Sequence, residues 1–144
     1  MPKRKYPGFS LIEILIVVGL ILILAAITIV AINPAKHFRD TRNSERSADI
    51  SELLNAITQF TAEDGRTLAD LGTIPLCSDG PGNLGTGAID LEPALVDEFI
   101  VEIPTDPSVG TDVNTGYTIC QTDGGRVELA APNAEDGKEI VVRR

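Results

Sequence analysis

The sequence predicts an α+β fold in which a long N-terminal helix is followed by a small antiparallel β-sheet. Three observations support this class. Residues 9–32 are almost entirely apolar, the second half of residues 35–64 has apolar side chains at helical spacing, and residues 117–143 contain alternating segments separated by turn signals. A period near 3.6 residues is typical of helices, and a period of two is typical of strands. A chain of 144 residues is long enough for one ordinary domain.

The first of these segments, Phe9–Ile32, is predicted to cross a membrane. It has 24 residues and a single charge, at Glu13. A helix of this length measures about 36 Å at ~1.5 Å per residue, which exceeds the roughly 30 Å of a hydrocarbon core. A cleaved secretory signal is the alternative, but its apolar region spans about 7–15 residues and ends in a small-residue cleavage site. Here the small residues Ala25, Ala26 and Ala31 lie inside the run, which favours a span.

The charge balance argues against nucleic acid as a partner. The net charge is −9, and the residues after the basic leader (Lys3, Arg4 and Lys5) carry 9 basic and 21 acidic side chains, or −12. An acidic domain repels phosphate backbones, so we expect no nucleic-acid contact.

The basic leader favours a cytoplasmic N-terminus. Cys77 and Cys120 form an even pair, which suits an oxidising compartment outside the cytoplasm, although two unrelated buried thiols are the alternative.

A second helix is predicted for Ala35–Asp64, after a break at Asn33-Pro34, because proline lacks the amide proton that a continuous helix needs. Two i,i+3 ion pairs, Arg42–Glu45 and Arg46–Asp49, are expected on its surface. Gly65 is expected to end it. The apolar stripe of its second half comprises Ile50, Leu53, Leu54, Ile57 and Phe60.

The remaining segments are expected to be short. The glycines of Ser78–Ala88 predict a flexible loop, Leu91–Ile100 a short helix, and the prolines of Ile103–Pro107 an extended run. Tyr117–Thr122 and Arg126–Ala131 are predicted to form a hairpin around Asp123-Gly124-Gly125. A third strand is predicted within Lys138–Arg143.

The motifs of enzymes and metal sites are weak in this sequence. Gly80–Gly85 fits the spacing of a dinucleotide-binding loop, but the Gly85-Thr86-Gly87 that follows would not start the required helix. The single histidine, His37, excludes a serine triad or a His/Cys zinc cluster within one chain. We therefore expect no enzymatic activity and no cofactor. The one metal considered is Ca²⁺, for which the candidate ligands are Asp106, Asp112 and Asp123, although a solvated acidic loop is the favoured interpretation.

Glu13 is the one residue that the membrane-span prediction does not explain. A carboxylate at the start of a helix is tolerated at the membrane interface, where the helix N-terminus favours negative charge. An acidic residue inside a span, however, indicates a functional role and needs a partner. If the chain were cut after Gly8, the new amine of Phe9 would stand one helical turn from Glu13. The amine of a neighbouring copy would be equally suitable.

These residues carry a resemblance. The run Gly8-Phe9-Ser10-Leu11-Ile12-Glu13, after a basic leader and before a long apolar helix, resembles the prepilin processing site of type IV pilins and pseudopilins. The resemblance implies that a prepilin peptidase removes residues 1–8 and methylates Phe9. It implies a lollipop fold, in which residues 9–32 form the transmembrane and later filament-core helix and residues 33–144 the extracytoplasmic domain. It also implies a helical filament of identical copies, in which Glu13 acts in assembly, and an inner-membrane assembly platform as a partner.

The second half of the chain extends the resemblance. Ile103-Pro104-Thr105-Asp106-Pro107, followed by Gly116-Tyr117, is similar to the C-terminal part of major pseudopilins of type II secretion. This favours a secretion pseudopilin over a type IV major or minor pilin that serves motility, adhesion or DNA uptake. The alternative from another class is a single-span, membrane-anchored extracytoplasmic binding domain. Many pilins close a C-terminal disulfide loop, whereas a bond from Cys77 to Cys120 would join the loop after the helix to a strand. The implied location is the cytoplasmic membrane, and then a periplasmic or cell-surface filament.

Overall fold

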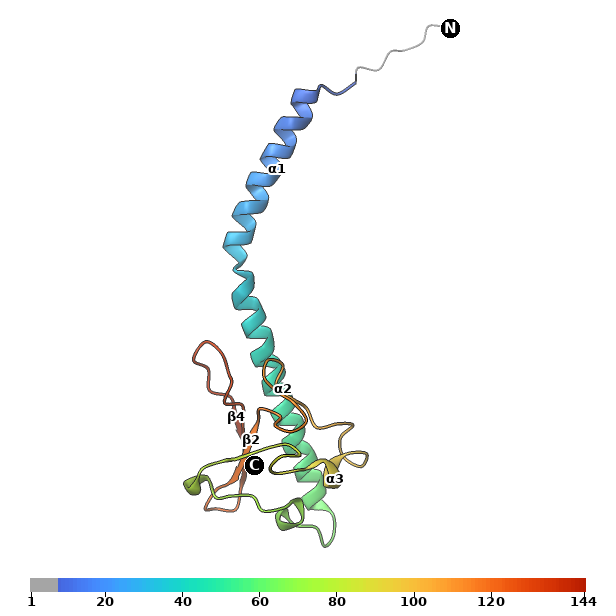
Figure 1. The fold of residues 1–144 in the computed structure, drawn as a ribbon, viewed down its shortest axis with the longest axis vertical. Coiled ribbons are helices and arrows are strands. Elements are labelled where there is room, and N and C mark those ends of the chain that lie inside the picture. The colour runs from blue at the N-terminus through green and yellow to red at the C-terminus, as the bar shows by residue number, and fades with distance from the viewer. Residues whose placement is uncertain (1–7) are drawn as a thin grey trace, which may run out of the picture. The chain divides into compact units, whose positions relative to one another are not determined.

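The computed structural model describes residues 8–144 (Figure 1). Their internal contacts divide them into two compact units, with the boundary between residues 37 and 38. The first unit contains helix α1 (Leu11–Ile32). Ser10 has extended backbone at the start of α1, and Asn33 ends it in the left-handed region, with φ of 48°. Helix α2 (Pro34–Ala62) begins directly afterwards, so the predicted break at Asn33-Pro34 is present. Proline suits this first helical position because no intrahelical partner is needed for its nitrogen.

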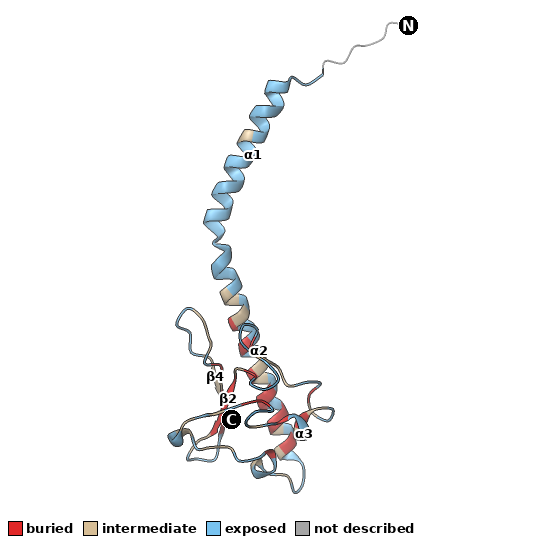
Figure 2. Ribbon diagram, viewed as in Figure 1, coloured by how far each residue is buried: buried red, intermediate tan, exposed pale blue. Residues whose placement is uncertain are grey.

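The second unit is built around the C-terminal half of α2. All five residues of the predicted apolar stripe are buried (Figure 2), and they belong to one core cluster with Tyr117 and with side chains of the sheet such as Ile119 and Leu129. Burial of this face stabilises the helix, since isolated helices gain little from backbone hydrogen bonds alone. The helix ends at Ala62, and Gly65 follows it with a positive φ of 85°.

The sheet contains four antiparallel strands in the order β1-β2-β3-β4. The strands are β1 (Gly82–Asn83), β2 (Thr118–Gln121), β3 (Val127–Ala130) and β4 (Val141–Arg143). The predicted hairpin joins β2 to β3, and Gly125 has a φ of 78° within its turn. Buried residues alternate with partly exposed ones along β3, as expected for a sheet with one face on the core. The predicted α+β class, with helices followed by a small antiparallel sheet, is confirmed.

The prediction of a flexible loop at Ser78–Ala88 was wrong in part. Ser78–Ala88 is not a featureless loop, because Gly82 and Asn83 pair with Ile119 and Thr118 of β2. A Cβ atom on Gly82 would lie 2.5 Å from the side chain of Ile89, so the glycine allows a close approach that its flexibility alone did not predict.

The short helix predicted at Leu91–Ile100 is only one turn long, α3 (Glu92–Leu95). Val96 is extended and Asp97 has a positive φ of 71°, which together end the helix early. Two 3₁₀ turns, η1 (Leu68–Leu71) and η2 (Cys77–Asp79), complete the described elements.

Candidate assembly site

Helix α1 places Glu13 in its first turn, beside the predicted cleavage junction. The amide of Glu13 donates a hydrogen bond to the carbonyl of Ser10 at 3.1 Å, so the helix begins directly after the junction. Gly8 precedes this turn and Phe9 is 77% exposed. The Gly8–Phe9 bond is therefore accessible. A carboxylate in this position is also favoured by the unpaired backbone amides of the first turn.

Except at Glu13 and Thr28, the side chains of α1 are apolar on every side of the helix, and none of its residues is buried (Figure 2). Within residues 8–144, one helical stretch is long and apolar enough to cross a membrane, and it starts at Leu11 near the N-terminus. The hydroxyl of Thr28 donates to the carbonyl of Leu24 at 2.5 Å, which satisfies this polar group inside the helix. A helix that is apolar all round and unburied in its own chain suits lipid or the helices of other copies.

Glu13 has no cationic partner in this helix, because residues 9–32 contain no lysine, arginine or histidine. A cationic partner therefore cannot be a side chain of this segment. The amine that cleavage would create at Phe9 is the nearest candidate in the sequence, and the same amine of another copy is the second.

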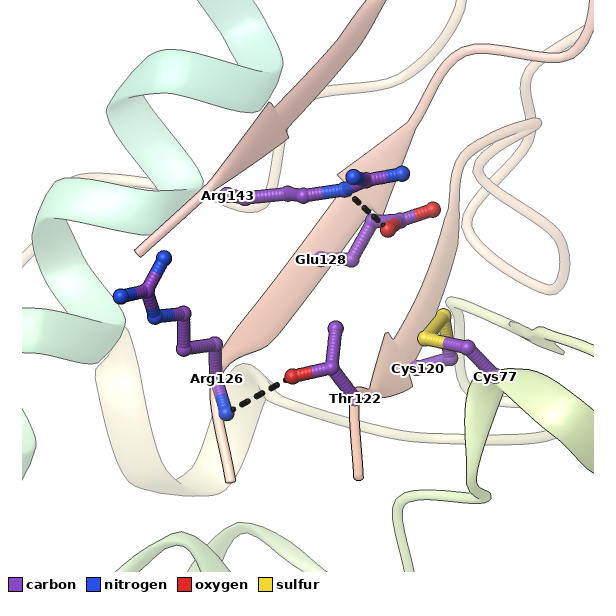
Figure 3. Close-up of a disulfide and its surroundings, with 6 residues drawn as sticks. All are labelled: Cys77, Cys120, Thr122, Arg126, Glu128 and Arg143. Carbon is purple, nitrogen blue, oxygen red and sulfur yellow. Dashed lines mark hydrogen bonds and ion pairs between the residues drawn. A yellow bond between two sulfur atoms is a disulfide. The ribbon is translucent and has the colours of Figure 1, made fainter. Parts of the chain in front are cut away.

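The two cysteines are bonded to each other, with their Cα atoms 4.9 Å apart (Figure 3). The bond holds η2 against β2, where the amide of Gln121 also donates to the carbonyl of Pro75 at 2.8 Å. On the other side of Cys120, Glu128 is its directly opposite neighbour on β3, and Arg143 of β4 donates to Glu128. The bond therefore anchors the C-terminal end of the segment that links α2 to the sheet, and Leu71 of the same segment is buried in the core.

We expect peptide mapping of the non-reduced protein to find Cys77 linked to Cys120. A variant with Ser at both positions should lose roughly 2–4 kcal/mol of unfolding free energy, because the unfolded chain regains the freedom of a long loop. The measurement is urea denaturation of the oxidised protein and the variant. Two free thiols in protein from an oxidising compartment would contradict the pairing.

Among the described residues, one group of three side chains has metal-ligand atoms close together, namely Cys77, Cys120 and Glu128. Its two sulfur atoms are bonded to each other, which removes both thiolates as ligands. The calcium candidates Asp106, Asp112 and Asp123 do not form such a group. Asp106 is buried and accepts hydrogen bonds from Arg46. Asp112 lies in an exposed loop, and Asp123 lies in the β2–β3 turn.

A buried ion-pair cluster that local sequence spacing does not predict lies on the α2 side of the domain. The side chains of Arg46 and Asp106 are both fully buried, and two guanidinium nitrogens of Arg46 donate to the two carboxylate oxygens of Asp106 at 2.7 and 3.1 Å. Arg46 also contacts Glu135 at 3.1 Å, and Arg42 donates to the same carboxylate. A bidentate arginine–carboxylate pair is among the strongest hydrogen-bonded contacts in proteins.

This cluster replaces the surface ion pairs predicted for α2. Arg46 turns into the domain instead of pairing with Asp49, and the carboxylate of Asp49 accepts a hydrogen bond from the hydroxyl of buried Tyr117 at 2.5 Å. Asn43 completes the contact, because its side chain bonds both the amide and the carbonyl of Glu135. Arg42, Asn43 and Arg46 lie on one face of α2 and thereby hold the loops that contain Asp106 and Glu135 against this helix. The signal in the sequence was the polarity of residues 42–46 just before the apolar stripe.

The cluster predicts that the domain loses stability in acid. Burial alone would raise the pKa of Asp106, but the hydrogen bonds from Arg46 and Ser108 lower it to about 2. The hydrogen bond from Arg42 lowers the pKa of Glu135 from 4.5 to about 2. Carboxylates whose pKa is lower in the folded state add stability above their unfolded pKa, and that stability is lost as the pH falls through the folded value.

Unfolding free energy should therefore decrease between about pH 4.5 and pH 2. Burial raises the pKa of Asp49, so that residue acts in the opposite direction. The measurement is urea denaturation across this range, and Glu135→Gln should flatten the dependence. A stability that is constant from pH 5 to pH 2 would contradict the cluster.

Comparison with known proteins gives one match. The family described as "Prokaryotic N-terminal methylation motif" matches residues 3–29, a range that includes Gly8, Phe9 and Glu13. No curated protein and no solved structure matches the chain. The match covers the Gly8–Phe9 junction and most of α1, and it does not extend to the domain that follows.

Proposed function

We propose that this chain is a structural subunit of a type IV pilus-like filament, since its residues 3–29 match the prokaryotic N-terminal methylation motif. The observation that carries the proposal is the combination of this motif with an apolar helix that its own chain leaves unburied. The role is structural rather than catalytic. The partners are the prepilin peptidase, the bilayer before assembly, other copies of the chain and an inner-membrane assembly platform.

The proposed sequence of events follows from the helix. Before assembly, lipid covers the apolar surface of α1. A subunit can leave the bilayer without exposing that surface to water only if other copies of α1 replace the lipid. Identical subunits that share one head-to-tail contact form an open helical polymer. In this arrangement the domain after residue 33 faces the extracytoplasmic side, where its disulfide is stable.

Within this class we propose a major pseudopilin of type II secretion. The Ile103–Pro107 run and Gly116 support it, because these two segments meet in the fold. The amide of Asp106 donates to the carbonyl of Thr115 at 2.7 Å. Gly116 has a φ of 82°, and a Cβ atom there would lie 2.7 Å from the side chain of Asp106. Glycine is therefore required beside the buried aspartate.

Two other functions lead to different observations. A type IV pilin would form filaments that extend from the cell surface, and deleting it would remove motility, adhesion or DNA uptake rather than the release of secreted proteins. A membrane-anchored binding domain would keep the span but would need neither cleavage at Gly8 nor an acidic residue at position 13. Comparing secreted proteins and surface filaments in a deletion strain separates the first two functions.

The proposal predicts processing at the Gly8–Phe9 bond. Mass spectrometry of the native protein should give a chain that begins at Phe9 with one added methyl group. The control is the same chain expressed without a prepilin peptidase, which should retain residues 1–8. An intact leader in the presence of the peptidase, or a start near Ala35, would contradict the proposal.

A further inference from the structure

A row of polar side chains crosses the sheet beside the disulfide. Cys120 of β2 is the register partner of Glu128 on β3, and Glu128 is the partner of Arg143 on β4. Successive side chains of a strand point to opposite faces of the sheet. Because Leu129, the neighbour of Glu128, belongs to the core, the row lies on the face turned away from the core. Cys77 of η2 reaches the row at Cys120 (Figure 3).

The two cysteines and the carboxylate bring three metal-ligand atoms together. Both Sγ atoms and a carboxylate oxygen of Glu128 lie within 4.8 Å of one another. Thiolates and carboxylates bind Zn²⁺ at about 2.0–2.3 Å, so atoms that share one ion lie at most ~4.6 Å apart. Arg143 donates to Oε2 of Glu128, and within residues 8–144 no other hydrogen bond or ion pair engages this carboxylate. Oε1 therefore remains available, and Arg143 orients the group as outer partners of metal ligands commonly do.

Backbone contacts hold the two cysteines near each other independently of their covalent bond. Leu76 forms a parallel bridge with Gln121, so the residues that flank Cys77 and Cys120 are paired. The amide of Gln121 also donates to the carbonyl of Pro75 at 2.8 Å. In the reduced chain these contacts would keep both thiols beside Glu128, which lowers the cost of ordering a binding site.

We propose that the reduced chain binds one Zn²⁺ through Cys77, Cys120 and Glu128, and that formation of the disulfide releases the ion. Two thiolates favour Zn²⁺ over the hard cations Ca²⁺ and Mg²⁺. Three protein ligands leave the fourth position of the ion to water. The site would protect the thiols from wrong pairing until the chain reaches an oxidising compartment. The proposal does not depend on the filament.

Both steps balance. When Zn²⁺ binds, each of the two thiols loses one proton to solvent. When the bond forms, the two thiolates give two electrons to the disulfide of an oxidant, which takes up two protons and becomes a pair of thiols. The new sulfur–sulfur bond removes both thiolates as ligands, so the ion leaves. Glu128 keeps its charge and its contact with Arg143.

Metal binding by the full chain in detergent tests the proposal. The chain is reduced with a phosphine without oxygen, freed of the reductant, and titrated with Co²⁺ as a spectroscopic probe. We expect one Co²⁺ per chain, a thiolate-to-cobalt charge-transfer band in the near ultraviolet, and loss of this band when Zn²⁺ is added. Zn²⁺ should also raise the urea midpoint of the reduced chain, because it binds the folded state. The oxidised chain is the control and should show neither effect.

Substitutions identify the ligands. Glu128→Gln keeps the shape of the side chain and should weaken Co²⁺ binding at least about ten-fold, since even residues that only orient ligands have effects of that size. The matched control Glu139→Gln removes the same charge from an exposed position outside the group and should leave the affinity unchanged. Cys77→Ser and Cys120→Ser should each remove most of the charge-transfer band.

The remaining outcomes also decide the question. A reduced chain that unfolds cooperatively in urea but binds no Co²⁺ would overturn the proposal. A reduced chain that loses its folded domain would overturn it as well, and any Co²⁺ held by the thiols of such a chain would be unaffected by Glu128→Gln. Neither result would bear on the filament, which is proposed from residues 3–29 and the unburied surface of α1.

Discussion

The variant Glu13→Ala should be inserted in the membrane and cleaved at Gly8 normally, while filament formation falls steeply. Insertion should survive because α1 remains long and apolar without the carboxylate. Cleavage should survive because the Gly8–Phe9 junction is unchanged and Phe9 stays exposed. Assembly should fail because the mature amine at Phe9 would then enter the filament core without an acidic partner.

The size of the effect follows from burial. Residues 9–32 contain no basic side chain. In a filament core built from these segments, the mature amine of Phe9 is therefore the cationic group that can pair with Glu13. Removing one partner of a buried ion pair typically costs about 3–5 kcal/mol, since the other charge is left unpaired. Even the lower end of that range corresponds to more than a hundred-fold change in an equilibrium. An apolar helix has few other features that fix the axial position of a new subunit, so Glu13 would also set the register.

Two further substitutions identify what the side chain contributes. Glu13→Gln keeps the shape without the charge and should assemble as poorly as Glu13→Ala. Glu13→Asp keeps the charge with a shorter reach and should be intermediate. Each variant is expressed with its assembly machinery, its cleavage is checked by mass, and filaments are counted by microscopy. If Glu13→Ala were cleaved and assembled as well as the wild type, the carboxylate would be an interfacial residue and this role would be wrong.

The sequence predicted the parts of the fold that depend on neighbouring residues. The break at Pro34 follows from the chemistry of proline, the stripe from Ile50 to Phe60 from helical spacing, and the hairpin around Gly125 from turn chemistry. The junction at Gly8 and Phe9 and the acid at Glu13 were recognised for the same reason, because they lie within a few residues of one another.

The contacts that were missed join residues far apart in the chain. Arg46 and Asp106 are separated by 60 positions, and Asn43 and Glu135 by 92. Local spacing instead favoured an ion pair between Arg46 and Asp49, which would form if both side chains were exposed on the surface of α2. The difference is burial, since a fully buried guanidinium needs several acceptors at once and a single helix cannot supply them. A cavity of about 390 Å³ beside α3 was missed for the same reason, because its lining comes from three separate segments.

The variant Arg46→Met should destabilise the domain by about 3–5 kcal/mol, the usual cost of leaving one member of a buried ion pair alone. Met is unbranched and is the apolar residue closest to Arg in bulk, so the loss measures the charge and its hydrogen bonds more than the volume. Asp106 would remain buried, with Oδ1 still bonded to Ser108 and Val109 and with Oδ2 turned toward an apolar group. The measurement is urea denaturation of the processed chain in detergent. Tyrosine fluorescence reports on this domain, because Tyr117 is the single tyrosine after residue 8 and is fully buried.

Two comparisons make the result specific. Arg39→Met removes an ion pair with Asp136 whose side chains are about one third exposed, and it should cost no more than about 1 kcal/mol. The double variant Arg46→Met/Asp106→Asn removes both buried charges and should recover part of the loss, since the remaining amide can still accept the hydrogen bonds of Ser108 and Val109. If Arg46→Met cost as little as Arg39→Met, the cluster would contribute no more than a surface pair. The loops at 106 and 135 would then be held to α2 by Asn43 and the apolar core, not by the buried arginine.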